Sequence, residues 1–197
     1  ENLQMSPDDL KRKIRKDTKA VVIVHIGGII SPKMEEILNI CSEYNVPLVE
    51  DAAHAHGSEY NNIKAGNIGI AASFSFYPTK ILTTAEGGMI TTNDERIYKN
   101  AIVLREHGKS GLKPNIHTDI GDNWRFSEIH AALGLQQMKK VEYIVSERTR
   151  LAKLYDNLLD VNNGVERIII PDHVKSSYYK YIVFLPSYVD RQFIKQQ

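Results

Sequence analysis

The chain has 197 residues, which is enough for one sizeable core, or for one domain with part of a second. Hydrophobic residues make up 42% and charged residues 25%, values that are ordinary for a soluble globular protein. The 25 basic and 24 acidic side chains leave a formal net charge of +1, which gives no reason to expect a nucleic acid or another polyanion as a partner.

The first predicted elements are a helix and a buried strand. The basic run from Lys11 to Lys16 has the spacing of the solvent-facing side of a helix, and we interpret it in this way rather than as a nucleic-acid patch. The continuous apolar run over residues 20–25 predicts a strand that is covered on both faces. Gly27 and Gly28 then break the run.

A second helix and a second strand follow. Ser31 is a plausible N-cap and Pro32 a favourable first helical residue. Residues 46–50 form the next apolar strand, which ends at Asp51. An apolar stripe on the helix includes Met34, Ile37, Leu38 and Cys41. Cys41 is the only cysteine, so no intrachain disulfide can form, and its place in this stripe favours a buried thiol in a reducing compartment.

The remaining elements continue the alternation. Strands are expected over residues 71–76 and 88–92. After them we expect a helix from Asn93 or Asp94 to about His107, and then a loop over 109–124. The rest of the chain shows a long helical pattern over 127–159, a late strand over 178–185 and a helix from about Ser187. This order predicts a mainly parallel sheet with helices on its faces, in which ligands bind at the strand ends.

Two groups of polar residues stand just past predicted strands. Asp51 directly follows a strand, where an acid can face a ligand or simply form a turn or helix cap. His54 and His56 come next, but residues this close in a loop need not share an orientation, and no ligand-rich cluster supports them, so we expect no metal.

Lys80 follows the third strand and a proline, which is unusual for a solvated lysine, although a surface lysine in a turn remains an alternative. A lysine in a cleft becomes nucleophilic toward carbonyl groups. Nearby hydroxyls suit a phosphate, and they belong to Ser75, Thr79, Thr83 and Thr84. Glu86-Gly87-Gly88 lacks the spacing of a nucleotide-binding loop. The residues alone therefore predict an α/β domain with a polar ligand site, without identifying the reaction.

Several ordered motifs carry a resemblance to a known family. They are Val49-Glu-Asp-Ala-Ala-His-Ala-His-Gly57, Ser73-Phe-Ser-Phe-Tyr-Pro-Thr-Lys80, Thr83-Thr-Ala-Glu-Gly-Gly-Met89, Leu104-Arg-Glu-His-Gly108 and Ile120-Gly-Asp-Asn-Trp-Arg-Phe-Ser-Glu-Ile129. Together they resemble the DegT/DnrJ/StrS-type sugar aminotransferases over roughly residues 10–185. The resemblance implies pyridoxal phosphate as the cofactor and a partial aspartate-aminotransferase-like fold (PLP fold type I, a three-layer αβα large domain).

The resemblance also implies roles for single residues. Lys80 would carry the cofactor and shuttle the proton, and its presence argues against the dehydratases of the family, which have histidine there. Asp51 would pair with the pyridine nitrogen. The other implied cofactor-binding residues are Ala53 on the ring face, His54 near the phenolic oxygen, Ser75 at the phosphate, and Asn123 at a neighbouring subunit's cofactor, with Arg125 assisting. His56 matches the family without a chemical role, and we expect it to be structural.

These implications define the expected organisation. Residues 1–125 would be part of the cofactor-binding large domain, 126–160 a long connecting helix, and 161–197 the start of a smaller α+β domain. The enzyme would transfer an amino group, with glutamate as donor, to the keto group of a nucleotide-linked sugar, in surface polysaccharide or glycosylated metabolite synthesis. The resemblance at Asn123 implies a homodimer. We expect a cytoplasmic protein without a membrane partner, because we find no membrane-spanning run and no signal peptide. The alternative is a noncatalytic fragment with an incomplete site, since family members are considerably longer.

Overall fold

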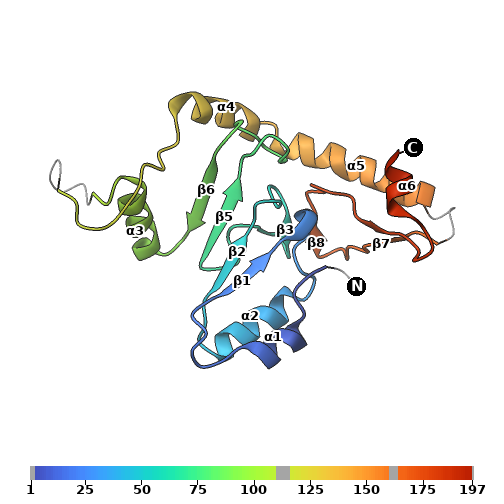
Figure 1. The fold of residues 1–197 in the computed structure, drawn as a ribbon, viewed down its shortest axis with the longest axis horizontal. Coiled ribbons are helices and arrows are strands. Elements are labelled where there is room, and N and C mark those ends of the chain that lie inside the picture. Colours follow the sequence, from blue (N-terminus) through green and yellow to red (C-terminus); the bar gives the residue numbers. More distant parts are fainter. Residues whose placement is uncertain (1–2, 110–115, 160–163, 197) are drawn as a thin grey trace.

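A four-stranded sheet is the centre of the fold (Figure 1). The structure is a computed structural model that describes residues 3–109, 116–159 and 164–196. The strand order is β1 (Val21–Val24), β2 (Leu48–Asp51), β5 (Ala71–Ser75) and β6 (Gly88–Thr92). The first three strands are parallel to one another, and β6 is antiparallel to β5. The four strands confirm the predicted ones, and the sheet is mainly parallel as expected.

Helices and short strands surround this sheet. The helices are α1 (Pro7–Lys13), α2 (Met34–Glu43), α3 (Glu95–Arg105), α4 (Glu128–Met138), α5 (Val141–Leu159) and α6 (Arg191–Gln196), with a short 3-10 turn, η1 (Ile26–Gly28). Two small sheets consist of β4 (Ile63–Lys64), β3 (Glu59–Tyr60) and β8 (Val174–Lys175), and of β7 (Glu166–Arg167) and β9 (Val183–Phe184).

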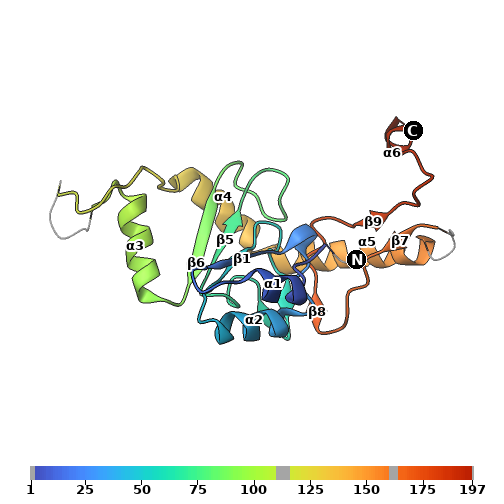
Figure 2. The ribbon, with the colours of Figure 1, turned by 60° about the horizontal axis from the view of Figure 1, so that its bottom comes forward.

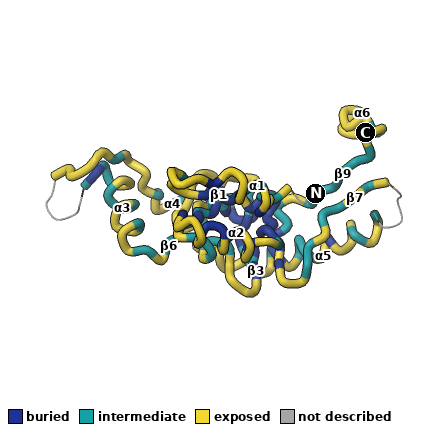
Figure 3. The backbone as a smooth tube through the Cα atoms, turned by 90° about the horizontal axis from the view of Figure 1, so that it is seen from below, coloured by how far each residue is buried: buried dark blue, intermediate teal, exposed yellow. Residues whose placement is uncertain are grey.

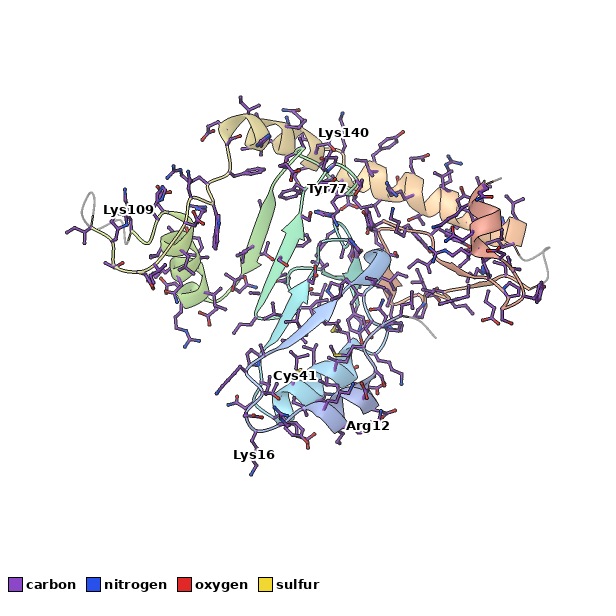
Figure 4. All side chains as sticks on the ribbon, in the orientation of Figure 1. Arg12, Lys16, Cys41, Tyr77, Lys109 and Lys140 are labelled. Carbon is purple, nitrogen blue, oxygen red and sulfur yellow. The ribbon has the colours of Figure 1, made fainter. Side chains whose placement is uncertain are left out.

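The main core lies between one face of the sheet and helices α1 and α2. Ser6 caps α1, because its hydroxyl accepts a hydrogen bond from the Asp9 amide. Ile23 and Ile37 are fully buried where the sheet meets α2. Figure 3 shows this concentration of buried residues around β1 and α2, whereas α3 and α6 are mostly exposed. In Figure 4, Cys41 lies inside this packing. Arg12 is exposed in α1, and the basic run thus lies on a solvated surface as predicted.

The opposite face of the sheet is uncovered in the described part of the chain. Val22 is 56% exposed, Val24 42% and Ile90 59%. The prediction that the first strand is covered on both faces is therefore wrong for this chain, because only Val21 and Ile23 meet a helix layer. An apolar run shows that both faces suit burial, but it does not show whether a covering element is present.

Several predicted boundaries differ from the structure, including the start of the last helix, which is Arg191 rather than about Ser187. Helix α2 begins at Met34 rather than at Pro32, because the Ser31 carbonyl and hydroxyl form a turn before it. The long helix expected over 126–160 is two helices, α4 and α5, which a turn at Lys139 and Lys140 separates. Of the late strand expected over 178–185, only Val183–Phe184 pairs as a strand. The predicted loop over 109–124 lies partly outside the described residues, at 110–115.

The chain after α5 returns to the first part of the molecule. Strand β8 pairs antiparallel with β3, so that Tyr60 lies opposite Val174. The ammonium groups of Lys64 and Lys175 both contact Glu59 and Glu142, which joins β3, β4, β8 and α5. Figure 1 shows β8 beside β3, and Figure 2 shows β8 close to α2. The residues that follow β8 therefore reach the ends of the central strands.

Candidate functional site

The carboxyl ends of β2 and β5 bring all the predicted site residues except Asn123 and Arg125 to one edge of the sheet. Asp51 is the last residue of β2, and the strand register places it opposite Ser73 of β5. Ser75 is two residues further along β5 and therefore faces the same side of the sheet. This side is the uncovered one. The loops that follow the two strands contain His54 and Lys80.

The Asp51 carboxylate is held by its own loop and keeps one oxygen free. The Ala53 amide donates a hydrogen bond to Asp51 Oδ1 at 3.1 Å. This contact forms an Asx turn, so the alternative reading of Asp51 as a turn former also holds. Among the described residues, no donor reaches Asp51 Oδ2. The half-buried carboxylate can therefore still accept a hydrogen bond from a ligand.

His54 is a neutral imidazole with a defined tautomer. The Gly27 amide donates to His54 Nδ1 at 3.3 Å, and this bond assigns the ring proton to Nε2. Burial lowers the pKa of His54, and the positive charge of Lys80 lowers it further, whereas the negative charge of Asp51 opposes both effects. The charges of Lys80 and Asp51 thus both lie near enough to this ring to affect its pKa.

Lys80 carries an amine without a carboxylate partner in the described ranges. Its backbone amide donates to the Tyr77 carbonyl at 2.9 Å, which closes the turn after β5. Its Nζ atom lies 5.0 Å from the centre of the Tyr179 ring. The Tyr179 hydroxyl in turn lies 3.0 Å from Thr79 Oγ1. The half-buried amine is thus directed by an aromatic ring rather than by an acid.

The hydroxyls around Lys80 are not all available to a phosphate. Thr83 Oγ1 donates to the Phe76 carbonyl at 3.0 Å, and Thr84 Oγ1 donates to the Glu86 carbonyl at 2.6 Å. Thr84 is also buried. The expectation that these two threonines surround a phosphate is therefore corrected, since their hydroxyls close the turn between β5 and β6. The Ser75 hydroxyl accepts only a long contact from the Tyr77 amide, at 3.4 Å, and keeps its own proton.

His56 lies beneath this group of residues. It is buried, and its ring packs against Phe74 and Phe76 with centroid distances of 5.2 and 5.5 Å. Burial lowers its pKa to about 4, and the positive charge of Lys80 acts in the same direction. Neither ring nitrogen meets hydrogen-bond geometry with a described group, although the Ser75 backbone is near enough to favour protonation slightly. Its packing supports the expected structural role.

The structure does not bring Asn123 to this cluster. Asn123 forms a backbone bridge with Glu106, and its backbone amide donates to Asp122 Oδ1 at 2.7 Å. Arg125 Nη1 contacts Glu106 Oε1 at 2.6 Å. All of these residues belong to an arm that extends from α3, away from β2, as the position of Lys109 in Figure 4 illustrates. Asn123 is exposed there and meets no described residue of the Lys80 group.

Sequence reasoning missed one member of the site, Tyr179. Its ring stacks on His54 with a centroid distance of 4.4 Å and an interplanar angle of 30°. Its hydroxyl bonds to Thr79, a hundred residues earlier in the chain. The tyrosine-rich stretch over residues 178–185 predicts only a strand. No local pattern shows that this stretch returns to the strand ends.

The described ranges contain no metal cluster and no membrane-spanning helix, and their pocket lies elsewhere. No group of three or more His, Cys, Asp or Glu side chains there could hold a metal ion. No described helix combines the length and apolar composition needed to cross a bilayer. A pocket of about 470 Å³ runs along α5, but it shares no residue with the strand-end cluster, and its lining is Glu142, Val145, Ser146, Thr149, Arg150, Lys153 and Lys175.

Comparisons with known proteins agree with this geometry. The model of the DegT/DnrJ/EryC1/StrS aminotransferase family matches residues 1–196. A UDP-4-amino-4,6-dideoxy-N-acetyl-beta-L-altrosamine transaminase from Campylobacter jejuni is 37% identical over 171 residues, which are 86% of this chain and 45% of that protein. Helicobacter pylori PseC, an aminotransferase involved in pseudoaminic acid biosynthesis, is 32% identical with a TM-score of 0.86, covering 98% of this chain and 51% of that one.

A third relative was solved in its PLP form. This protein from Streptococcus pneumoniae is 26% identical, with a TM-score of 0.84, and the match covers 93% of this chain and 52% of that one. The chain thus has the aspartate-aminotransferase-like fold (PLP fold type I) of its structural neighbours and spans about half the length of the curated relatives it matches.

Proposed function

We propose that this chain, which belongs to the DegT/DnrJ/EryC1/StrS aminotransferase family, carries the pyridoxal phosphate centre of an enzyme that transfers an amino group to the keto group of a nucleotide-linked sugar. One observation carries the proposal: Asp51 and Lys80 come from the ends of neighbouring strands, and Tyr179 links the two loops, because its ring stacks on His54 of the Asp51 loop and lies 5.0 Å from Lys80 Nζ. An amine and a carboxylate from the same edge of the sheet could serve one small heterocycle.

The residues present fit this cofactor. Asp51 has a carboxylate oxygen that no described donor reaches, and the proton on a pyridine nitrogen would match it. Lys80 has an amine that no described carboxylate neutralises, as a nucleophile toward an aldehyde requires. Ser75 keeps a hydroxyl proton for a phosphate oxygen. The small side chain of Ala53, half-buried beside Asp51, would let a flat ring approach closely.

Each residue then has a defined task. When bound, pyridoxal phosphate supplies an electron sink for the carbon that gains or loses the amino group. Lys80 would hold the cofactor covalently and, once an incoming amine releases it, would move a proton at the reacting carbon. The Asp51 carboxylate would keep the ring nitrogen protonated, and each unit by which it raises that pKa corresponds to about 1.4 kcal/mol. His54 would donate its Nε2 proton toward the phenolic oxygen.

The finer parts of the proposal concern substrates and assembly. The relatives named above are aminotransferases, and one of them acts in the synthesis of a nucleotide-linked sugar, which supports such an acceptor and a role in polysaccharide or glycosylated metabolite synthesis. Glutamate is proposed as the donor. The exposed arm supports a homodimer in which Asn123, assisted by Arg125, reaches the partner's cofactor. The single buried cysteine fits the reducing cytoplasm.

An absorption experiment tests the central assignment. Pyridoxal phosphate is added to the full-length protein, and we expect the band of a covalently joined cofactor, which borohydride reduction fixes on Lys80 for detection by mass spectrometry. The Lys80→Ala variant should lose both signals. Lys140→Ala, which removes an exposed lysine outside the cluster, should keep them. An unchanged band in Lys80→Ala, or no band in the unaltered protein, would refute the assignment.

The uncovered sheet face favours a second candidate for this chain by itself. Val22 and Ile90 are exposed on the same face of the sheet as Asp51 and Ser75. The chain alone would then be a folded, noncatalytic piece with an incomplete site. Comparing the cofactor affinity of these 197 residues with that of a full-length protein separates the two candidates, because tight and equal binding by both would reject the second one.

A further inference from the structure

Tyr179 reaches the site from a distant part of the chain. It follows β8, yet it makes three contacts at the ends of the central strands. Its ring stacks on His54 at 4.4 Å, its hydroxyl lies 3.0 Å from Thr79 Oγ1, and Lys80 Nζ lies 5.0 Å from its ring centre. Thr79, which precedes Lys80, and His54, in the loop after Asp51, thus both contact the Tyr179 side chain.

Buried hydroxyl groups fix the segment that carries Tyr179. Ser176 Oγ and Ser58 Oγ both donate to the Gly28 carbonyl, at 3.0 and 2.7 Å. Ser177 Oγ donates to the His54 carbonyl at 3.0 Å. All three serines are buried. Because buried hydrogen bonds compete with little water, this network holds the segment rigidly against the His54 loop.

The turn at Gly27 and Gly28 makes the approach possible. Both glycines have positive φ values, +66° and +89°, which side chains rarely adopt. A Cβ atom on Gly28 would lie 2.3 Å from Ser177 Oγ and 2.9 Å from the His54 carbonyl oxygen. The Gly27 carbonyl also accepts a hydrogen bond from the Lys180 amide at 3.1 Å. The backbone on both sides of Tyr179 is therefore anchored, and the position of its ring is determined.

We infer that Tyr179 is a positioning residue of the proposed reaction, which directs the Lys80 amine and orients the His54 ring. This role in a reaction rests on the proposed function, whereas the contacts of Tyr179 do not. The electron-rich face of the ring attracts the ammonium group, the hydroxyl fixes Thr79 next to Lys80, and the stacking prevents His54 from rotating away from the Gly27 amide. Removing the ring should therefore release both functional side chains at once.

Nuclear magnetic resonance of the cofactor-free protein tests this inference without any activity. The lysines are labelled by reductive methylation with 13C, and Lys80→Arg identifies the Lys80 signal. Because the signal of an amine near a ring face is displaced by the ring current, we expect the Lys80 signal to stand apart from those of all exposed lysines except Lys180, whose Nζ lies 4.8 Å from the centre of the same ring. Tyr179→Ala should move it to their position and also shift the His54 ring signals. Tyr188→Ala, at a tyrosine that is 82% exposed, should change neither.

A second set of variants covers the case in which Tyr179→Ala fails to fold. Tyr179→Phe keeps the ring and removes the hydroxyl, and Thr79→Val removes the partner of that hydroxyl. In the full-length enzyme loaded with cofactor, we expect each variant to lower kcat about tenfold with KM little changed, because misplacement of a reacting group acts on the chemical step. The double variant should lose no more than either single one.

The outcomes separate this inference from the proposed function. Lys80 and His54 signals that remain unmoved in a folded Tyr179→Ala protein would overturn the positioning role. Additive losses in Tyr179→Phe and Thr79→Val would overturn the part played by the hydroxyl contact. A protein that never binds pyridoxal phosphate would instead refute the proposed function, and the resonance experiment would still decide whether Tyr179 directs Lys80.

Discussion

Glu50 offers the strongest test of how the fold supports the site. Its side chain is fully buried next to Asp51 in β2. It accepts hydrogen bonds from His25 Nε2 at 2.9 Å and from three backbone amides, of Gly66 at 2.9 Å and of Ile68 and Gly69 at 2.8 Å. One carboxylate thus ties β1 and the loop before β5 to the strand that ends in Asp51.

Replacing Glu50 by alanine removes all of these acceptors. Each buried donor left without a partner costs about 1–3 kcal/mol, and water that enters the space recovers part of that cost. We expect Glu50→Ala to lower the free energy of unfolding by about 3–5 kcal/mol, which is a large part of the 5–15 kcal/mol typical of a domain. Glu50→Gln keeps the shape and loses the charge, so a loss of about 1.5–3 kcal/mol is expected.

Urea unfolding followed by circular dichroism measures these losses. Glu43→Ala, at an exposed glutamate in α2, is the matched control and should stay within about 0.5 kcal/mol of the unaltered protein. A loss below about 1 kcal/mol in Glu50→Ala, in the presence of an intact fold, would refute the reasoning, because it would mean that the buried carboxylate is not the anchor of the loop.

The pH dependence supplies an independent check on Glu50. Burial acts to raise its pKa, but the hydrogen bonds from His25, Gly66, Gly69 and Ile68 outweigh burial and hold the pKa below its ordinary value of 4.5. A carboxyl whose folded pKa is lowered stabilises the fold above its unfolded pKa, and that stabilisation is lost as the pH falls through the folded value. The difference in stability between the unaltered protein and Glu50→Gln should therefore shrink below pH 4.5.

Two further predictions concern the turn and the histidine of the site. Gly28→Ala should lower the free energy of unfolding, measured with urea, by about 1–3 kcal/mol, since its φ of +89° and the nearby Ser177 hydroxyl leave no room for a Cβ. An unchanged free energy of unfolding would contradict the tight turn. A titration followed by nuclear magnetic resonance should give His54 a pKa below its ordinary value of 6.5. Its neutral form should therefore stabilise the fold above pH 6.5, and this stabilisation should be lost as the pH falls. A pKa above 6.5 would contradict its burial beside Lys80.

Local patterns predicted the central strands and most helices. The apolar runs at β1, β2 and β5 are long enough and sufficiently bounded by turn residues to be recognised, and Asp94 caps α3 as expected. The direction of β6 could not be predicted, because it depends on how the chain reverses after Lys80 rather than on the residues of the strand. The break between α4 and α5 also lacks a signal, since neither Lys139 nor Lys140 disfavours a helix.

The candidate site also contains residues that the sequence predicts and residues that only the structure reveals. Asp51, His54 and Lys80 come from segments that directly follow strands, so the strand-end rule brings them together. Thr83 and Thr84 have the right chemistry for a phosphate, but only the structure reveals that backbone carbonyls already accept their hydroxyl protons. The contribution of Tyr179 depends on contacts that span a hundred residues, which no short pattern encodes.

A crystal structure of the full-length protein grown with pyridoxal phosphate tests the central claim most directly. We expect continuous electron density from Lys80 Nζ to the cofactor, with the ring nitrogen within hydrogen-bond distance of Asp51. A cofactor that is joined to another lysine, or whose ring nitrogen lies against a group other than Asp51, would contradict the claim that these two side chains serve one molecule.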